Sequence, residues 1–299
     1  LISGAVVKAF QLQDAVNKGV LDAGHTVPAY WYGKSKVASL FGTGPVFGLS
    51  ADQNMAWIHH GGGQALYDEL LQNLGLNLVG FFCMPMPAQP LGWFKKEIKT
   101  SEDMKGLKYR TVGLATDLMQ AMGVKVTQLS GGEIVPALER GVIEAFEYNN
   151  PTSDSRFGAQ DVSKHYHLCS YHQASEFFEI MVNKGKFDAL PDEHKAIIKY
   201  AAEAASSANY WKGQDLYSKD LQWLQEKAGV NVYRTPKGVL EDQLKAWDQL
   251  LVELEKDPFF AKVVASQKEF AKRVAYYDLT NAPDYKLAYD HYFPGTLKF

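Results

Sequence analysis

The amino-acid sequence predicts an α/β protein of two lobes with a ligand-binding cleft between them. A chain of 299 residues is long enough to fold around two separate cores. Residues 109–151 read as one strand–helix–strand–helix–strand unit that brings Arg110 and Glu147 to the ends of strands in one open sheet. Folds of this class bind ligands at such strand ends.

An internal repeat supports the two-lobed arrangement. Residues 16–24 resemble residues 138–146: in each segment a helix ends at a basic residue and a glycine, and a short apolar strand with one acidic residue follows. The two segments start about 120 residues apart, which indicates two similar lobes. Because the glycine lets the chain turn directly into the sheet, we expect each strand to pair in parallel.

The composition is that of an ordinary globular protein and gives no reason to expect nucleic acid or an anionic membrane surface as a partner. Its net charge is −3 and its pI is near 6.3. No apolar run approaches the ~20 residues needed to span a bilayer. Cys83 and Cys169 are predicted to be buried or half-buried thiols. Leu1-Ile2-Ser3-Gly4 contains neither a signal peptide nor an initiator methionine, so we expect a leader and a first strand to precede this numbering.

The first lobe is predicted to span residues 1–106. Apolar residues at helical spacing indicate helices over residues 52–60 and 64–74, and an apolar strand follows at 77–82. Residues 101–106 read as a capped helical turn that leads the chain into the second lobe.

The second lobe, with the hinge strands, is predicted to span residues 107–232. A long helix begins near Leu190, with proline in its first turn and acidic residues at the positive end of its dipole, and continues to about Lys227. Residues 233–299 are predicted to be helical and to pack back on the first lobe. A shorter helix is expected at residues 116–122, and strands at 124–127, 142–146, 164–170, 177–183 and 231–233.

Three polar residues are the candidates for a small-molecule site. Arg110, Gln89 and Glu147 all lie at the ends of predicted elements beside turn-forming residues, so they can converge on one cleft. Arginine offers a planar fork that holds a carboxylate through two charge-assisted hydrogen bonds. Gln89 and Glu147 offer hard oxygen atoms that suit a bound cation.

Other motifs carry no comparable chemistry. Gly42-Thr43-Gly44-Pro45 and Gly61-Gly62-Gly63 lack the flanking residues of phosphate-binding loops and fit turns beside bulky aromatic residues. His59-His60 and the pair His165 and His167 lack a third metal ligand at a suitable offset. There is no Gly-x-Ser-x-Gly or His-Glu-x-x-His motif, so the sequence offers no positive evidence for an enzyme.

The sequence resembles the solute-binding proteins of tripartite ATP-independent periplasmic (TRAP) transporters. The resemblance covers nearly the whole chain, and several motifs are similar to those of the branch that binds 2-oxo acids, whose close relatives bind lactate and related 2-hydroxy acids. The motifs are Tyr109-Arg110, residues 131–145 (GGEIVPALERGVIEA), Phe41-Gly42-Thr43-x-Pro45-x-Phe47-Gly48, Ala51-Asp52-Gln53-Asn54-x-Ala56-Trp57, Gly61-Gly62-Gly63 and Gly92-Trp93-Phe94-x-Lys96-Glu97-Ile98.

The resemblance implies a periplasmic-binding-protein fold, a long helical C-terminal region and a role for each polar candidate. Arg110 would clamp the substrate carboxylate, and Gln89 would contact both the ligand and a bound cation. Glu147 would give that cation a side-chain oxygen and Tyr148 a backbone carbonyl. Tyr148 departs from the tryptophan that is usual at this position, which leaves the size of the pocket open.

A second departure concerns the choice of cation, sodium or calcium. Where the branch has an aromatic residue followed by glutamate, this chain has Tyr171-His172-Gln173. Either Gln173 replaces the acid as a cation ligand, or Glu176 serves from a shifted register. Losing a carboxylate would favour a monovalent cation over calcium, because fewer anionic ligands weaken a divalent site.

The resemblance also implies the remaining parts of the mechanism. The lobes would close over a small carboxylate and hand it to the TRAP membrane permease subunits, and the protein would be periplasmic. Tyr30, Trp31, Tyr32 and Phe47 would wall the aliphatic tail, with core packing as the alternative for each. The C-terminal helices would support a homodimer.

Two other functions stay open. One is an enzyme acting on a 2-oxo acid in the same cleft, for which Glu147 is the one candidate base. The other is a sensor module that presents the ligand to a receptor.

Overall fold

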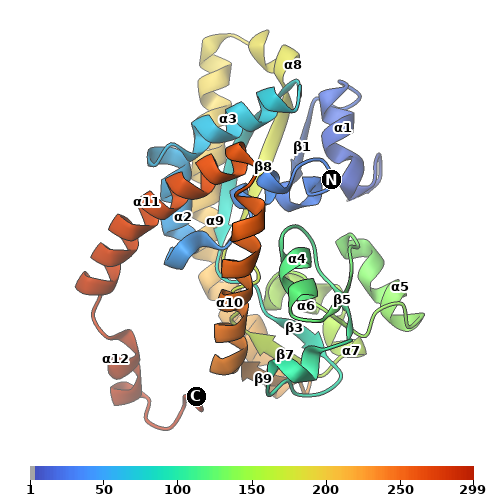
Figure 1. Cartoon of the computed structure of the whole chain (residues 1–299), viewed down its shortest axis with the longest axis vertical. Coiled ribbons are helices and arrows are strands. Elements are labelled where there is room, and N and C mark those ends of the chain that lie inside the picture. Colours follow the sequence, from blue (N-terminus) through green and yellow to red (C-terminus); the bar gives the residue numbers. More distant parts are fainter. Residues whose placement is uncertain (1–3) are drawn as a thin grey trace.

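Two β-sheets organise the chain in this computed structural model, which describes residues 4–299 (Figure 1). The smaller sheet has the order β1-β8-β2, with β1 at Ala23–Thr26, β8 at Glu176–Asn183 and β2 at Leu78–Met86. Both pairings in this sheet are antiparallel. The expected leader and first strand concern residues outside the described range.

The larger sheet contains the predicted unit of residues 109–151. Along the chain this unit consists of β4 (Lys108–Arg110), α4 (Ala115–Ala121), β5 (Lys125–Thr127), α5 (Ile134–Glu139) and β6 (Ala145–Phe146). β4 pairs in parallel with both β5 and β6. The sheet has the order β5-β4-β6-β3-β7-β9, in which β3 is antiparallel to its two neighbours. Its strands are β5 (Lys125–Thr127), β4 (Lys108–Arg110), β6 (Ala145–Phe146), β3 (Gly92–Phe94), β7 (His165–Leu168) and β9 (Asn231–Arg234).

The strand pairings differ from two of our expectations. We expected the strand at 177–183 to lie in the second lobe, but β8 pairs with β1 and β2. We also expected the strand after Gly19 to pair in parallel, whereas β1 is antiparallel to β8. Local sequence patterns predict that a strand forms, but the partner is chosen by packing with distant segments. The lobe boundaries at residues 106 and 232 stay a prediction. Two strands do not follow them: β3 lies in the larger sheet although it precedes residue 106, and β8 lies in the smaller sheet although it follows that residue.

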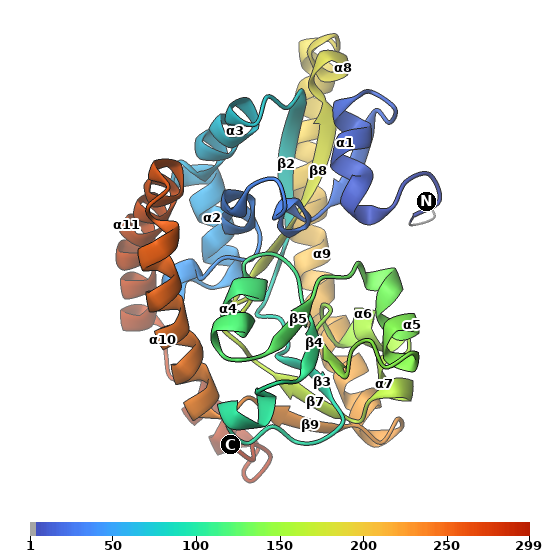
Figure 2. The same cartoon turned by 45° about the vertical axis from the view of Figure 1, so that its right-hand side comes forward.

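The chain crosses between the sheets twice before the long helix α9 (Asp192–Glu226). Residues 87–91 join β2 to β3, and residues 169–175 join β7 to β8. The predicted long helix is confirmed, and α9 runs past both sheets and packs on β2 and on α6 (Pro151–Arg156) (Figures 1 and 2). Within residues 4–299, no helix is both long enough and apolar enough to cross a membrane.

Three shorter helices agree closely with the sequence prediction. The helices expected at 52–60, 64–74 and 116–122 form as α2, α3 and α4. The helices are α1 (Leu12–Asn17), α2 (Ala51–His60), α3 (Gly63–Asn73), α4 (Ala115–Ala121), α5 (Ile134–Glu139), α7 (Ala159–Val162), α8 (Lys184–Asp188), α10 (Lys237–Leu254), α11 (Pro258–Asn281) and α12 (Tyr285–Tyr292). Short 3-10 helices cover Ala9–Gln11, Pro28–Trp31, Lys36–Phe41, Val46–Gly48, Ser101–Met104 and Gly131–Glu133.

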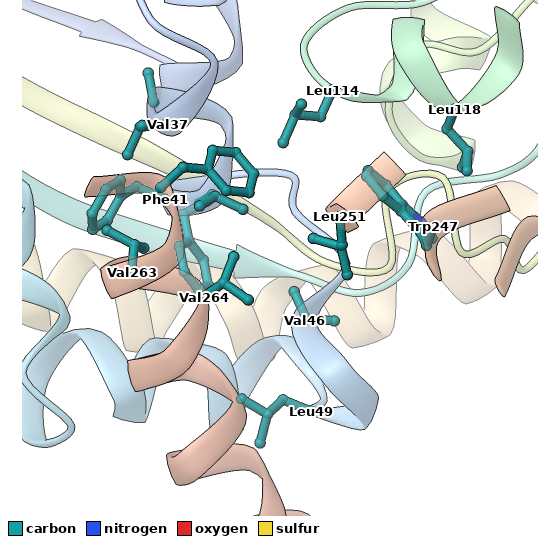
Figure 3. Close-up of a cluster of buried hydrophobic side chains, with 14 of the residues drawn as sticks. Val37, Phe41, Val46, Leu49, Leu114, Leu118, Trp247, Leu251, Val263 and Val264 are labelled. Carbon is teal, nitrogen blue, oxygen red and sulfur yellow. The ribbon is translucent and has the colours of Figure 1, made fainter. Parts of the chain in front are cut away.

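The C-terminal helices contact both halves of the molecule. α11 packs on α2, α3 and the 3-10 segments Lys36–Phe41 and Val46–Gly48, whereas α10 packs on α4 and Ser101–Met104. Figure 3 shows their side chains meeting in one cluster of buried apolar residues. The two cysteines are free, with Cys83 buried and Cys169 half-buried, as predicted.

A buried carboxyl group lies in the smaller sheet and requires a glycine on the neighbouring strand. Glu179 of β8 is fully buried and accepts a hydrogen bond from the hydroxyl of Tyr67. A Cβ atom at Gly80 of β2 would lie 2.0 Å from Oε1 of Glu179 and 2.7 Å from Cε1 of Tyr67. The absence of a side chain at Gly80 therefore makes room for the Tyr67–Glu179 pair.

Gly80→Ala is expected to destabilise the protein by about 2 kcal/mol or more, because the added methyl group overpacks a filled core. Gly132→Ala is the matched control, since a Cβ atom there meets nothing within 4 Å. Urea unfolding of both variants measures the difference. Equal free energies of unfolding for the two variants would show that the space at Gly80 is not needed.

Glu179 should also make stability depend on pH. Burial raises the pKa of Glu179 from 4.5 to about 8. Between these values the folded state keeps a proton that the unfolded state has released, so stability falls as pH rises through this range. The slope is on the order of 1.4 kcal/mol per pH unit. Glu179→Gln should lack this slope, and its stability relative to the parent should rise with pH. Urea unfolding of both proteins from about pH 5 to about pH 8 measures this dependence. Parallel curves of unfolding free energy against pH for the parent and the variant would contradict the prediction.

Candidate ligand-binding site

A buried arginine at the end of β4 is the centre of the site. Arg110 is 1% exposed and Glu147 is 0% exposed. Nη1 of Arg110 donates to Oε1 of Glu147 at 2.8 Å and to the Glu147 carbonyl at 2.8 Å, and Nε donates to the Leu129 carbonyl at 2.8 Å. Within the described chain Nη2 makes no hydrogen bond, so this nitrogen is available to a ligand in a guanidinium of fixed orientation.

The electrostatics of this pair keep the arginine charged. Burial would lower the pKa of Arg110, but the carboxylate of Glu147 raises it above its ordinary value. Burial raises the pKa of Glu147, and the charge of Arg110 and hydrogen-bonding groups on Thr111 and Gln173 oppose that rise. A buried guanidinium with one carboxylate partner and a free donor is suited to a second anion.

The two crossing segments bring amide oxygens to the same place. The backbone N–H of Gln89 donates to the carbonyl of Gln173 at 3.0 Å, which joins residues 87–91 to residues 169–175. Nε2 of Gln173 donates to Oγ1 of Thr111 at 3.3 Å. Oε1 of Gln89, Oε1 of Gln173 and Oε2 of Glu147 are buried and have no hydrogen-bond partner within residues 4–299.

Gln173 and Glu176, the two alternatives for the missing acid, both belong to this region. Glu176 is 3% exposed, and its Oε2 accepts from Nδ2 of Asn149 at 3.2 Å. Burial raises the pKa of Glu176 well above its ordinary range; the nearby charge of Glu147 adds to this, while a hydrogen bond from Gln89 opposes it. In the described part of the chain, His, Cys, Asp and Glu side chains form no metal-binding group of three or more.

Tyr148 lies beside the guanidinium and is held by packing. Its half-buried ring has its centre 6.0 Å from Cζ of Arg110 and meets the ring of Phe157 edge-on at 4.9 Å. A Cβ atom at Gly131 would lie 2.4 Å from Cε2 of Tyr148, so this glycine allows the ring to pack against the backbone. Tyr148 thus lies beside Arg110 and Glu147, and with Gln89 and Gln173 of the crossing segments it completes the candidate site.

The sequence analysis missed the residue that fixes the turn after β6. Asp154 is fully buried, its Oδ1 accepts from the backbone N–H of Asn149 at 3.1 Å, and its Oδ2 accepts from Trp93 at 2.8 Å and Tyr166 at 3.1 Å. Burial raises the pKa of Asp154 to about 7. The signal that was available is the pair Asn150-Pro151, in which asparagine caps α6 and proline starts it.

The predicted aromatic wall is only partly brought to the site. Burial raises the pKa of Tyr30 to about 12, and the nearby charge of Arg110 opposes this rise. The hydroxyl of Tyr32 donates to Asp117 at 2.8 Å. Trp31 packs on Tyr67 in the core, and the ring of Phe47 lies 5.3 Å from the ammonium group of Lys268 on α11. We therefore leave Trp31 and Phe47 out of the site, because their partners lie in the core and on α11.

The chain is similar over most of its length to a family of known proteins. Residues 3–257 match the model of the family described as bacterial extracellular solute-binding protein, family 7 (DctP). A monocarboxylate 2-oxoacid-binding periplasmic protein from a Nostoc species is 33% identical over 285 residues, which cover 95% of this chain and 77% of that protein.

Two solved structures of TRAP solute-binding proteins have the same fold, each at 30% sequence identity. One, from Bordetella bronchiseptica, has a TM-score of 0.89 and covers 97% of this chain and 84% of its own. It is a mixed-occupancy dimer with copurified calcium and picolinate in one site. The other, from Pseudoalteromonas atlantica, has a TM-score of 0.86 over 95% of this chain and 84% of its own, and holds sodium and pyruvate.

The family match and the Nostoc relative span most of the chain, and the fold agrees with both TRAP proteins. The chain therefore belongs to the DctP family of extracellular solute-binding proteins, which serve TRAP transporters.

Proposed function

We propose that this protein captures a small 2-oxo monocarboxylate such as pyruvate or 2-oxobutyrate, or a 2-hydroxy acid such as lactate, together with a bound cation. The observation that carries the proposal is the juxtaposition of a fixed, buried guanidinium with three buried acceptor oxygens that lack partners in residues 4–299. A ligand carboxylate would accept from Nη2 of Arg110. The two TRAP solute-binding proteins of known structure hold a carboxylate together with calcium or sodium, which supports this assignment.

The residues present fit a cation. Oε1 of Gln89, Oε1 of Gln173 and Oε2 of Glu147 are hard oxygen atoms, and an unpartnered buried acceptor is costly unless a cation or a donor meets it. Gln89, Gln173 and Glu147 would hold the cation, with the backbone carbonyl of Tyr148 as a further ligand. When bound, the cation would stabilise the negatively charged oxygens of the ligand electrostatically. Sodium is favoured, because only one carboxylate is placed among these ligands.

The crossing segments 87–91 and 169–175 both supply ligands, so binding draws the two sheets together around them. The closed protein would then present its ligand to the membrane permease of a TRAP transporter in the periplasm. No covalent step is part of this function. Glu147, the one base considered for an enzyme, is engaged by Arg110.

Native mass spectrometry of the purified protein, followed by calorimetry with pyruvate, 2-oxobutyrate and lactate, tests the proposal. We expect one carboxylate and one cation per chain, and tight binding without product. Turnover of a 2-oxo acid would instead establish the enzyme. Failure of all three acids to bind would reject the assigned ligand class.

We also propose that the C-terminal helices form a homodimer. The end of α11 and α12 carry exposed apolar and aromatic side chains and extend away from the rest of the molecule (Figure 1). These are Tyr276, Tyr277, Leu279, Tyr285, Leu287, Tyr289 and Tyr292, followed directly after α12 by Phe293. Sedimentation of the full chain and of the Tyr277→Glu/Leu287→Glu variant tests this, with a dimer expected for the first and a monomer for the second. A monomeric full chain would reject the dimer.

A further inference from the structure

A second cavity lies on the α9 side of the crossing segments, and we call it the hinge-side pocket. It has a volume of about 330 Å³ and is bounded by the end of β2, the turn after β6, α6 and α9. Phe178 of β8 completes its wall. Arg110, Glu147, Gln89 and Gln173 do not line this pocket, so it differs from the site described above.

The charge of the hinge-side pocket is positive. Arg156 of α6 and Lys212 of α9 both line it, and no aspartate or glutamate does. Neither basic side chain takes part in an ion pair with any residue from 4 to 299. Most other lysines on α9 and α10 have an acidic partner one turn away, as Lys219 has in Asp215. Two unpaired cations at one cavity in a protein of net charge −3 favour an anionic ligand.

The rest of the pocket wall suits a ligand with a flat apolar ring. The aromatic residues Tyr148, Phe178, Tyr210 and Tyr217 line the pocket together with methionines and prolines of β2 and the loop after it. Side-chain amides and hydroxyls complete it, including the buried Thr152, whose Oγ1 has no hydrogen-bond partner in the described structure. A volume of this size matches a small organic ligand.

We propose that the hinge-side pocket binds a second small organic anion, an aromatic carboxylate, whose charge is held by Arg156 and Lys212. The wall of the pocket contains Tyr148 and Asn149, and these two residues also border the Arg110 site. The centre of the Tyr148 ring lies 6.0 Å from the guanidinium carbon of Arg110, and Asn149 donates a hydrogen bond to Glu176. Occupation of the pocket therefore alters the affinity of the Arg110 site. This coupling rests on the proposed function, whereas binding in the pocket does not.

Calorimetry with benzoate as the probe tests the binding. In protein saturated with pyruvate, benzoate should bind once per chain. The Arg156→Gln/Lys212→Gln variant should weaken benzoate binding by about tenfold or more and leave pyruvate binding unchanged, which also shows that the variant is folded. The control variant Arg140→Gln/Lys199→Gln, with two exposed side chains outside the pocket, should bind both as the parent does.

Three results would overturn the proposal: no benzoate binding up to about 10 mM, equal benzoate affinity in parent and pocket variant, or complete displacement of benzoate by pyruvate. If pyruvate fails to bind, 2-oxobutyrate or lactate takes its place. If all three acids fail to bind, the proposed function fails, and the Arg110→Lys variant then replaces the acid as the block on the Arg110 site. For the coupling, benzoate should change the pyruvate affinity by the same factor as pyruvate changes the benzoate affinity. A factor of one would reject the coupling alone.

Discussion

Arg110→Ala is expected to weaken pyruvate binding well over tenfold, because a charge-assisted contact to a desolvated carboxylate contributes ~1.5–3 kcal/mol or more. Arg110→Lys should recover only part of the loss, since an ammonium group cannot hold Glu147 and a ligand with one rigid fork. Calorimetry measures the affinity. Arg140→Ala, an exposed arginine of the same half, is the control and should bind pyruvate normally.

The same substitution removes the partner of a buried carboxylate, so stability must be separated from binding. Loss of one partner of a buried ion pair costs about 3–5 kcal/mol. The double variant Arg110→Met/Glu147→Gln leaves no buried charge at either position and should recover stability without recovering pyruvate affinity. A folded Arg110→Ala protein with unchanged affinity would remove Arg110 from the site.

Gln173→Glu is expected to change the cation preference of the protein from sodium to calcium. The parent places one carboxylate, Glu147, among its proposed cation ligands, and a second anionic ligand strengthens a divalent site. Sodium removal should weaken pyruvate binding to the parent, whereas chelation of calcium should not. In the variant, calcium should raise pyruvate affinity by about tenfold or more.

Metal analysis and calorimetry in defined salts measure this change. Gln64→Glu, on α3 away from the site, is the control and should keep the sodium dependence of the parent. Stoichiometric calcium in the purified parent protein would contradict the preference for sodium. It would also point to Glu176 as an anionic ligand, because that side chain is buried beside Gln89 and Asn149.

The residues of the candidate site differ in whether the local sequence can predict them. Arg110 and Glu147 could be found because both lie at the ends of short strands within one local unit, and parallel pairing of β4 with β6 places the carboxyl ends of these two strands side by side. Asp154 could not be found in this way, because its partners Trp93 and Tyr166 come from β3 and β7. Their approach depends on strand order, which no local pattern encodes.

The sequence by itself determined the long helix, several shorter helices and most of the strands, and it indicated Arg110 and Glu147 as candidates for a ligand site. Periodicity, capping and strand-end position are local properties of the chain. Only the tertiary structure decided that β8 belongs with β1 and β2, that Gln173 and Glu176 both lie near the candidate site, and that the Phe47 ring lies beside the ammonium group of Lys268. Each of these depends on which distant segments bury one another, and burial is a property of the whole fold.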